Sequence, residues 1–142
     1  MKNENYKDAT ILLVEDDDID AKMVARAFKK LRIANPIVRA KDGVVALELL
    51  RDDTVVNPYI ILLDLNMPRM GGIAFLEEIR KDATLNTSIV FVLTTSKDDE
   101  DKVVAYNHNI AGYVVKERLE NGFEELVKLL DCYWRIVELP GT

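Results

Sequence analysis

Acidic side chains, a threonine and a lysine stand directly after apolar runs of this chain. Glu15 and Asp16 follow the first run, and Asp64 follows the third. Thr94 follows the fourth run, and Lys116 follows the fifth. If the runs lie side by side, the three carboxylates repel one another, and a hard divalent cation is the usual relief. The pattern therefore predicts an acidic magnesium (Mg²⁺) site flanked by a hydroxyl and an ammonium group.

Each of these residues also has an ordinary explanation. Glu15 and its acidic neighbours could cap a helix that begins there, where carboxylates are favoured. Thr94 could be an ordinary strand residue, and Lys116 could be a surface lysine with a buried stem. Asp64 is harder to explain in this way, because aspartate suits strands poorly. Together, at the ends of several strands, the residues favour a functional site.

The apolar runs alternate with amphipathic stretches, and this alternation predicts how the residues are brought together. The runs are residues 11–14, 37–38, 59–63, 89–93 and 112–115. Apolar strands separated by helices are typical of a parallel sheet with helices on both faces. Right-handed crossovers favour an α/β fold with a doubly wound five-stranded sheet, order 2-1-3-4-5, which is flavodoxin-like. In this order the first and third strands are neighbours.

The helical stretches carry apolar stripes of different strength. We expect the first helix to end at Asn35–Pro36, because a residue before proline disfavours the helical region. The stretch 98–108 is only weakly amphipathic, which suits an element that shifts easily. The first helix should bury Ile19, Met23, Ala27, Phe28 and Leu31, and the last one Phe123, Leu126, Val127, Leu130 and Trp134.

Length and composition limit the class of protein. We expect the 142 residues to form a single domain, with a core at about 9–136, a short tail at 137–142 and no output domain. The net charge of −6 and the lack of a basic stripe argue against nucleic-acid binding. The apolar runs are too short for a membrane span, and no secretory signal is visible. A lone cysteine, Cys132, suits a cytoplasmic protein.

The chain resembles the receiver domain of two-component response regulators. The match consists of Glu15-Asp16, the segment Asp64-Leu65-Asn66-Met67-Pro68 with Gly71-Gly72, Thr94 and Lys116. The resemblance implies a phosphorylation-controlled signalling module and not a metabolic enzyme. It makes Asp64 the phosphoacceptor, and it implies that Glu15, Asp16, Asp64 and the carbonyl of Asn66 hold Mg²⁺. It assigns Lys116 and Thr94 to the phosphoryl group, and Thr94 and Tyr113 to a conformational switch.

In such a switch, the phosphoryl group would draw Thr94 inward and Tyr113 would follow. That movement would change the surface formed by the fourth helix, the fifth strand and the fifth helix. Two residues depart from the family pattern. Glu117 stands after Lys116 where the family usually has proline, so the loop there could differ. Glu15 replaces the commoner aspartate, and its longer side chain can still ligate a cation.

A narrower resemblance points to the small single-domain regulators that are paired with bacterial phytochromes. It rests on the segments 57–66 and 93–96 and on Tyr133-Trp134 with Leu139-Pro140. It implies a sensor histidine kinase as phosphodonor, a phytochrome-type kinase in the narrower version, and an unidentified downstream protein. In that group the last helix takes part in dimer contacts, which makes Tyr133 a candidate contact in a homodimer. Trp134 continues the apolar stripe and is expected in the core.

Three other functions have to be compared with this one. A haloacid-dehalogenase-like phosphatase also forms an aspartyl phosphate beside magnesium, but it needs an aspartate where Asn66 stands, and a cap domain. A flavodoxin-like cofactor binder is excluded, because Glu15 and the three aspartates after it would repel a flavin phosphate. A phosphate-independent scaffold remains the main alternative, although it would not need Asp64, Thr94 and Lys116 together.

Overall fold

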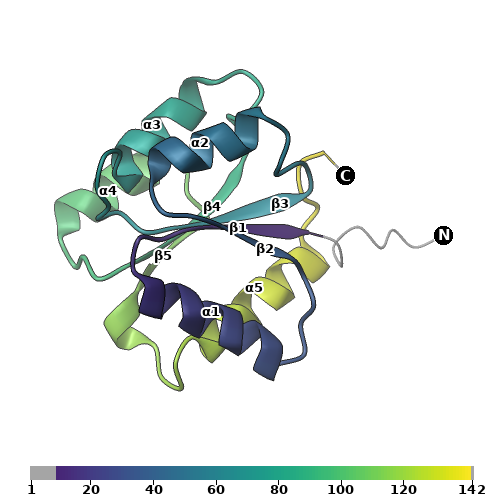
Figure 1. Cartoon of the computed structure of the whole chain (residues 1–142). Helices are drawn as coiled ribbons and strands as arrows, with labels where there is room; N and C mark the ends of the chain where they lie inside the picture. The colour runs from purple at the N-terminus through teal and green to yellow at the C-terminus, as the bar shows by residue number, and fades with distance from the viewer. Residues whose placement is uncertain (1–8, 142) are drawn as a thin grey trace.

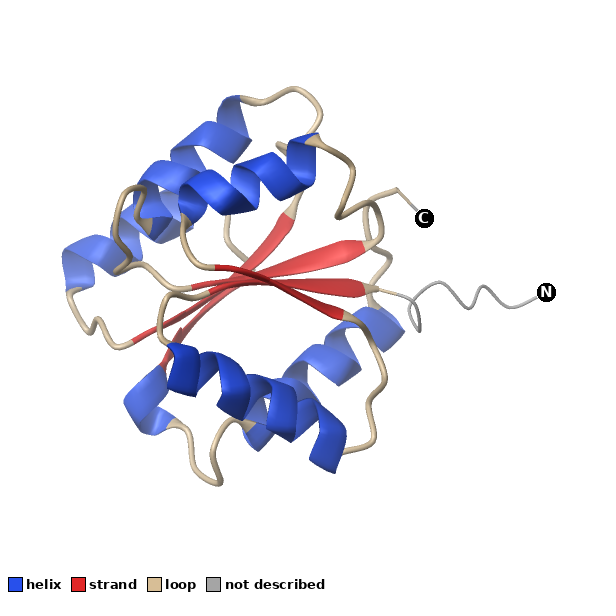
Figure 2. Cartoon of the chain, viewed as in Figure 1, coloured by secondary structure: helices blue, strands red, loops and turns tan. Residues whose placement is uncertain are grey.

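The computed structural model describes residues 9–141 and contains a parallel sheet between two layers of helices (Figures 1 and 2). Its strand order is β2-β1-β3-β4-β5, and every neighbouring pair is parallel. This confirms the predicted doubly wound α/β fold. The strands are β1 (Thr10–Val14), β2 (Ile37–Ala40), β3 (Tyr59–Leu63), β4 (Ile89–Thr94) and β5 (Gly112–Val115).

Helices cover both faces of the sheet. Helices α1 and α5 lie on one face, and α2, α3 and α4 lie on the other (Figure 1). Directly after β5, a short 3-10 helix, η2 (Lys116–Arg118), leads towards α5. The bounds are α1 (Asp18–Lys30), α2 (Gly43–Arg51), α3 (Gly72–Lys81), α4 (Asp99–Asn107) and α5 (Glu124–Ile136).

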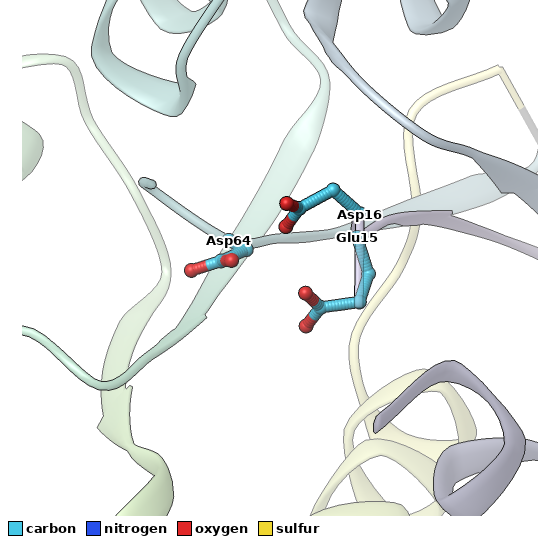
Figure 3. Close-up of side chains that lie close together, drawn as sticks. All are labelled: Glu15, Asp16 and Asp64. Atoms are coloured by element: carbon cyan, nitrogen blue, oxygen red, sulfur yellow. The ribbon is translucent and has the colours of Figure 1, made fainter. Parts of the chain in front are cut away.

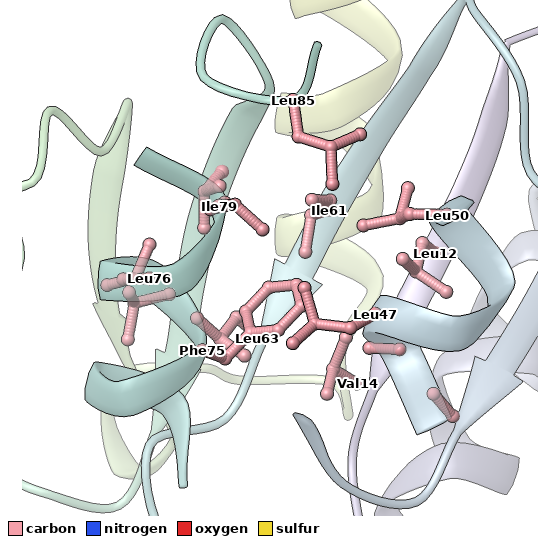
Figure 4. Packing of buried hydrophobic residues seen from close by; sticks show 14 of the residues in the cluster. Leu12, Val14, Leu47, Leu50, Ile61, Leu63, Phe75, Leu76, Ile79 and Leu85 are labelled. Atoms are coloured by element: carbon pink, nitrogen blue, oxygen red, sulfur yellow. The ribbon is translucent and has the colours of Figure 1, made fainter. Parts of the chain in front are cut away.

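Each face of the sheet has its own apolar cluster, because successive strand residues point to opposite faces. Leu12, Val14, Ile61 and Leu63 pack beneath α2 and α3 (Figure 4). Their chain neighbours Ile11, Leu13, Ile60 and Leu62 pack against α1 and α5 on the other face. All five residues of β3 are buried, as the continuous apolar run predicts. Burial of each such side chain contributes about 1.5–3 kcal/mol, which holds the central strands in fixed register.

The register brings the ends of β1 and β3 together. Val14 pairs with Leu63, the last residue of each strand. The amide of Asp64 then donates a hydrogen bond to the carbonyl of Val14 at 2.9 Å, and that of Glu15 donates to Ala40 at 2.9 Å. Both acidic residues therefore leave the sheet at its carboxyl edge with their backbones already fixed.

Helix α1 differs from the prediction in its length and its buried face. It ends at Lys30, and Arg32 follows with a positive φ of 58°, so the chain turns before Asn35–Pro36. Ile19 was predicted on the buried face but is 70% exposed. Its position in the first turn points to solvent, since the buried face is formed by Ala21, Val24, Ala27 and Phe28.

The C-terminal segment contributes to the core. Leu139 is only 6% exposed and belongs to the apolar cluster on the α1 and α5 face. The core therefore extends beyond residue 136, where it was predicted to end. Residue 142, the last of the predicted tail, lies outside the described residues. Within residues 9–141, no helix combines the length and apolarity that crossing a membrane requires.

Candidate acidic site at the carboxyl edge of the sheet

Glu15, Asp16 and Asp64 meet at the carboxyl ends of β1 and β3. One carboxylate oxygen from each residue lies within 4.8 Å of the others, and the side chains gather around one point (Figure 3). Glu15 and Asp64 are buried, whereas Asp16 is exposed. The two buried carboxylates thus sit beneath a third that faces solvent. The structure brings together the three acidic residues that the strand-end pattern singled out.

The acidic group is electrostatically unfavourable when it stands alone. Burial, together with the nearby charge of Asp64, raises the pKa of Glu15 from 4.5 to about 7 despite a hydrogen bond from Lys116. A divalent cation would remove this penalty by neutralising the carboxylates. An all-oxygen donor set that is open to water on one side fits Mg²⁺ or Mn²⁺. These residues can therefore hold such a metal.

Asn66, the fourth predicted metal residue, lies in the loop after β3. Its backbone amide is 3.4 Å from Oδ1 of Asp64 as a hydrogen-bond donor. Ligation of a cation by its carbonyl oxygen stays a prediction. The loop is held in place on its far side, where Arg69 pairs with Asp42 at 2.8 Å.

Glycine at position 72 allows α3 to begin directly against the end of β3. A Cβ atom at this position would lie 2.5 Å from the carbonyl oxygen of Asp64 and 2.8 Å from Leu65. Real Cβ atoms do not approach this closely, so a side chain here would displace the backbone of the aspartate. The Gly-Gly pair in the sequence thus has a steric reason.

Lys116 reaches the acidic group from the start of η2. Its Nζ lies 2.8 Å from Oε1 of Glu15 and 4.0 Å from Oδ2 of Asp64. A second carboxylate, Asp20 in α1, lies 2.7 Å from the same nitrogen. Burial lowers the pKa of Lys116, but the hydrogen bonds to Asp20 and Glu15 outweigh it and raise the pKa above its usual value. The lysine is therefore a fixed positive charge beside Asp64.

Asp20 is a site residue that the sequence did not reveal. It lies in the first turn of α1, where an acidic residue is commonly explained by the helix dipole. The neighbouring Asp17 does play that capping part, since its carboxylate accepts from the amides of Ile19 and Asp20. No motif or spacing distinguished Asp20 from Asp17 or Asp18.

Thr94 and Tyr113 are both linked to Ser96 in the loop between β4 and α4. The fully buried Thr94 hydroxyl accepts a hydrogen bond from the amide of Ser96 at 3.3 Å. The Tyr113 hydroxyl donates to the carbonyl of Ser96 at 3.1 Å. Burial raises the pKa of Tyr113, so this hydroxyl keeps its proton for the bond. The two predicted switch residues thus share one loop residue.

The other predicted features lie away from the acidic group. Glu117, at the family's usual proline position, pairs with Lys97 at 2.9 Å on the surface. Tyr133 is half-buried, and its ring packs edge to face against Phe91, with centroids 5.0 Å apart. Tyr133 therefore contacts its own core, and a role in a dimer stays a prediction.

Comparisons with known proteins place this geometry in a family. The family model for the response regulator receiver domain matches residues 11–130. The chain belongs to the response regulator receiver family. The response regulator Rcp1 of Synechocystis sp. is 31% identical over 147 residues, covering 100% of both chains.

Solved receiver structures extend the likeness to three dimensions. The Mn²⁺-bound form of Rcp1 superposes with a TM-score of 0.82 and 31% identity, over 94% of this receiver and 99% of Rcp1. The phosphorylated cyanobacterial phytochrome response regulator RcpA gives a TM-score of 0.79 and 29% identity over the same shares. Two predictions from the sequence are therefore confirmed: the resemblance to the receiver family and the narrower resemblance to phytochrome response regulators.

Proposed function

We propose that this receiver accepts a phosphoryl group on Asp64 from a sensor histidine kinase and uses it to control binding to another protein. The observation that carries the proposal is the position of Lys116, whose Nζ lies 4.0 Å from Oδ2 of Asp64 beside three grouped carboxylates. An acidic nucleophile, an acidic metal-binding set and a fixed ammonium are the parts that phosphoryl transfer to aspartate requires.

In the proposed reaction, a carboxylate oxygen of Asp64 attacks the phosphorus of the donor. The new O–P bond forms as the P–N bond to the donor histidine breaks, and the bonding pair returns to the ring nitrogen. The ring leaves as neutral imidazole when its other nitrogen carries a proton. With acetyl phosphate the P–O bond breaks instead, and acetate leaves as an anion. Asp64 gains an acyl phosphate and no redox change occurs.

The charges of this site serve the transfer. Mg²⁺, held by Glu15, Asp16, Asp64 and the carbonyl of Asn66, would neutralise charge on the transferred oxygens. Lys116 would donate to a phosphoryl oxygen from the other side. Asp64 keeps its orientation because its backbone amide is bonded to Val14. Its burial limits competition from water.

The proposed signal passes from the phosphoryl group through Thr94 to Tyr113. Thr94 would donate its hydroxyl hydrogen to a phosphoryl oxygen and move towards Asp64. The Ser96 loop would move with it, because the Ser96 amide and carbonyl are bonded to Thr94 and Tyr113. The readout surface is α4, β5 and α5. On α4 the apolar side chains of Val103 and Tyr106 are 58% and 48% exposed, which suits a protein partner.

The proposed function also specifies the partners of the receiver. A phytochrome-type histidine kinase is favoured by the likeness to RcpA, which is a cyanobacterial phytochrome response regulator. A kinase of this kind uses cytoplasmic nucleotide, so the proposed function places the receiver in the cytoplasm. The downstream protein is unidentified, and a homodimer through the exposed side of α5 remains a prediction.

The test is the intact mass of the protein after incubation with Mg²⁺ and acetyl phosphate. We expect one phosphoryl adduct that requires Mg²⁺ and is absent from an Asp64→Asn variant. An adduct of equal yield in that variant would place the phosphoryl group elsewhere. No adduct, together with no Mg²⁺ binding and no transfer from phosphorylated histidine kinases, would favour the phosphate-independent scaffold. Continuous hydrolysis of a phosphate monoester would favour the phosphatase.

A further inference from the structure

The ammonium group of Lys116 has two of its three hydrogens committed to carboxylates other than Asp64. An ammonium carries three donors and no acceptor. In the structure Nζ donates to Glu15 at 2.8 Å and to Asp20 at 2.7 Å. The distance to Asp64 is 4.0 Å, which is beyond hydrogen-bond length. One donor is therefore left, on a nitrogen that stands close to the nucleophile without touching it.

Asp20 is separate from the carboxylates that could hold a metal. The group that converges within 4.8 Å consists of Glu15, Asp16 and Asp64 and does not include it. Asp20 comes from α1, and its side chain is 22% exposed, whereas that of Lys116 is 10% exposed. Within the described residues, the recorded side-chain bond of Asp20 is the one to Lys116. Its carboxylate therefore acts on the site through the lysine.

Without Asp20 the lysine would have a different preferred position. A largely buried ammonium needs anionic partners, and Glu15 alone would remain in contact with it at 2.8 Å. The next carboxylate within reach, and the one that could replace Asp20, is Asp64 at 4.0 Å. A direct contact between Lys116 and Asp64 would cover the oxygen that has to attack phosphorus. It would also place the ammonium where the incoming phosphoryl group must lie. A carboxylate on the α1 side prevents this collapse by holding the nitrogen at a distance.

We propose that Asp20 is a positioning residue that holds Lys116 off the nucleophile and aims its free donor at the incoming phosphoryl group. This inference rests on the proposed phosphorylation of Asp64 and adds a residue to it. A nitrogen 4.0 Å from the aspartate oxygen leaves space for a phosphoryl oxygen between the two. The lysine then needs little movement when the acyl phosphate forms, which is the advantage of a preorganised site.

The test compares Asp20→Asn with Asp20→Glu in the full chain, using acetyl phosphate and Mg²⁺. Asparagine keeps the shape but loses the charge that holds the ammonium. We expect the rate of adduct formation at saturating phosphodonor to fall about tenfold, while the half-saturating concentration stays within about twofold. Glutamate keeps the charge on a longer arm, and it should restore most of the rate.

Asp18→Asn is the matched control. It removes the same charge from the same turn of α1, but Asp18 is bonded to Arg39 at 2.7 Å and not to Lys116. Its rate should stay close to that of the wild type. An equal loss in Asp18→Asn and Asp20→Asn would assign the effect to general charge and would overturn the inference.

A second measurement does not depend on phosphorylation. In a metal-free crystal structure of Asp20→Asn we expect Nζ of Lys116 to lie within hydrogen-bond distance of Asp64, about 2.7–3.2 Å. If the wild type takes the adduct, an unchanged lysine position in Asp20→Asn, or an unchanged rate of adduct formation in that variant, overturns the inference alone. A wild type that takes no adduct from any donor overturns the proposed function, and the inference with it.

Discussion

At the scale of single residues, the site is governed by carboxylates that are expensive to ionise where they stand. Glu15 shows this most clearly, because burial and the charge of Asp64 raise its pKa from 4.5 to about 7. Lys116 offsets part of that cost but is shared with Asp20. The longer glutamate, in place of the commoner aspartate, lets one carboxylate reach the lysine while it lies beside Asp16 and Asp64.

The raised pKa of Glu15 predicts that Mg²⁺ affinity depends on pH. Below a pH of about 7 this carboxyl holds a proton that a cation must displace. Affinity should therefore rise as pH increases to about 7 and then level off. Titration calorimetry at about pH 6 and about pH 8, in buffers of different ionisation enthalpy, measures both the affinity and the released proton.

A Glu15→Gln variant is the control for this prediction. It should bind Mg²⁺ more weakly and lose the proton release, and an unchanged pH dependence would show that another group titrates. The metal-free protein has the matching stability effect. Protonated Glu15 contributes to the free energy of unfolding, and this contribution is fully present below pH 4.5. It is lost as pH rises to about 7, because in this range Glu15 ionises in the unfolded chain but keeps its proton in the folded protein.

Asp64, Glu15 and Asp16 could be predicted from the sequence, because a polar residue directly after a buried strand must lie at the carboxyl edge of the sheet. Asp20 could not be predicted in this way. It lies in a helix, and its bond to Lys116 joins residues 96 positions apart. Such pairing depends on how α1 packs against the sheet edge. A single sequence does not encode that packing in a readable pattern.

At the scale of elements, the position of Asp64 depends on how closely α3 approaches the end of β3. The helix starts at Gly72, whose amide donates to the carbonyl of Leu65 at 3.0 Å. The contact is possible because Gly72 lacks a side chain. The apolar stripe of α3 fixes the helix from the other side, with Phe75, Leu76 and Ile79 fully buried. The helix therefore cannot move away from the end of β3 without exposing the core.

We predict that Gly72→Ala destabilises the receiver and disturbs the acidic site. The new Cβ would lie 2.5 Å from the carbonyl oxygen of Asp64, so the backbone of this aspartate must shift. Overpacking of this kind costs about 1–3 kcal/mol in the free energy of unfolding. Urea unfolding measures that loss, and titration calorimetry should show weaker Mg²⁺ binding in the fraction that stays folded.

Gly71→Ala is the neighbouring control. Its Cβ would meet the carbonyl oxygen of Leu65 at 3.1 Å, a milder contact that a small shift can relieve. We expect a smaller loss of stability and nearly normal Mg²⁺ binding. If both variants bind Mg²⁺ as the wild type does, the glycine does not set the position of Asp64.

The element pattern could be predicted because each strand is a continuous apolar run and each connection contains a helix. The errors came from the ends of elements. The burial of Ile19 was predicted from its type and spacing, but its side chain is 70% exposed. The buried face of α1 is formed instead by Ala21, Val24, Ala27 and Phe28. The end of α1 was predicted from Pro36, although the turn at Arg32, with its positive φ, stops the helix earlier.

At the scale of the whole molecule, the sheet separates two cores, and the last residues of the described chain close one of them. Trp134 is buried and stacks on Phe28 of α1 with ring centroids 6.3 Å apart. Leu139 returns to this cluster after α5 has ended. Gly141 then lies against Asn57, just before β3. The segment after α5 therefore links the outer helix layer back to the start of the central strand.

We predict from this packing that Leu139→Ala lowers the free energy of unfolding by about 2–4 kcal/mol, as is typical of a buried leucine. Val137→Ala is the control, because Val137 is 38% exposed and should cost less than about 1 kcal/mol. Urea unfolding followed by Trp134 fluorescence measures both, since this is the single tryptophan of the chain. Equal small losses would mean that the tail is not part of the core. A large loss in Leu139→Ala with an unchanged denaturant slope would show that the tail unfolds together with the sheet, because a separately opening tail would leave the main transition in place.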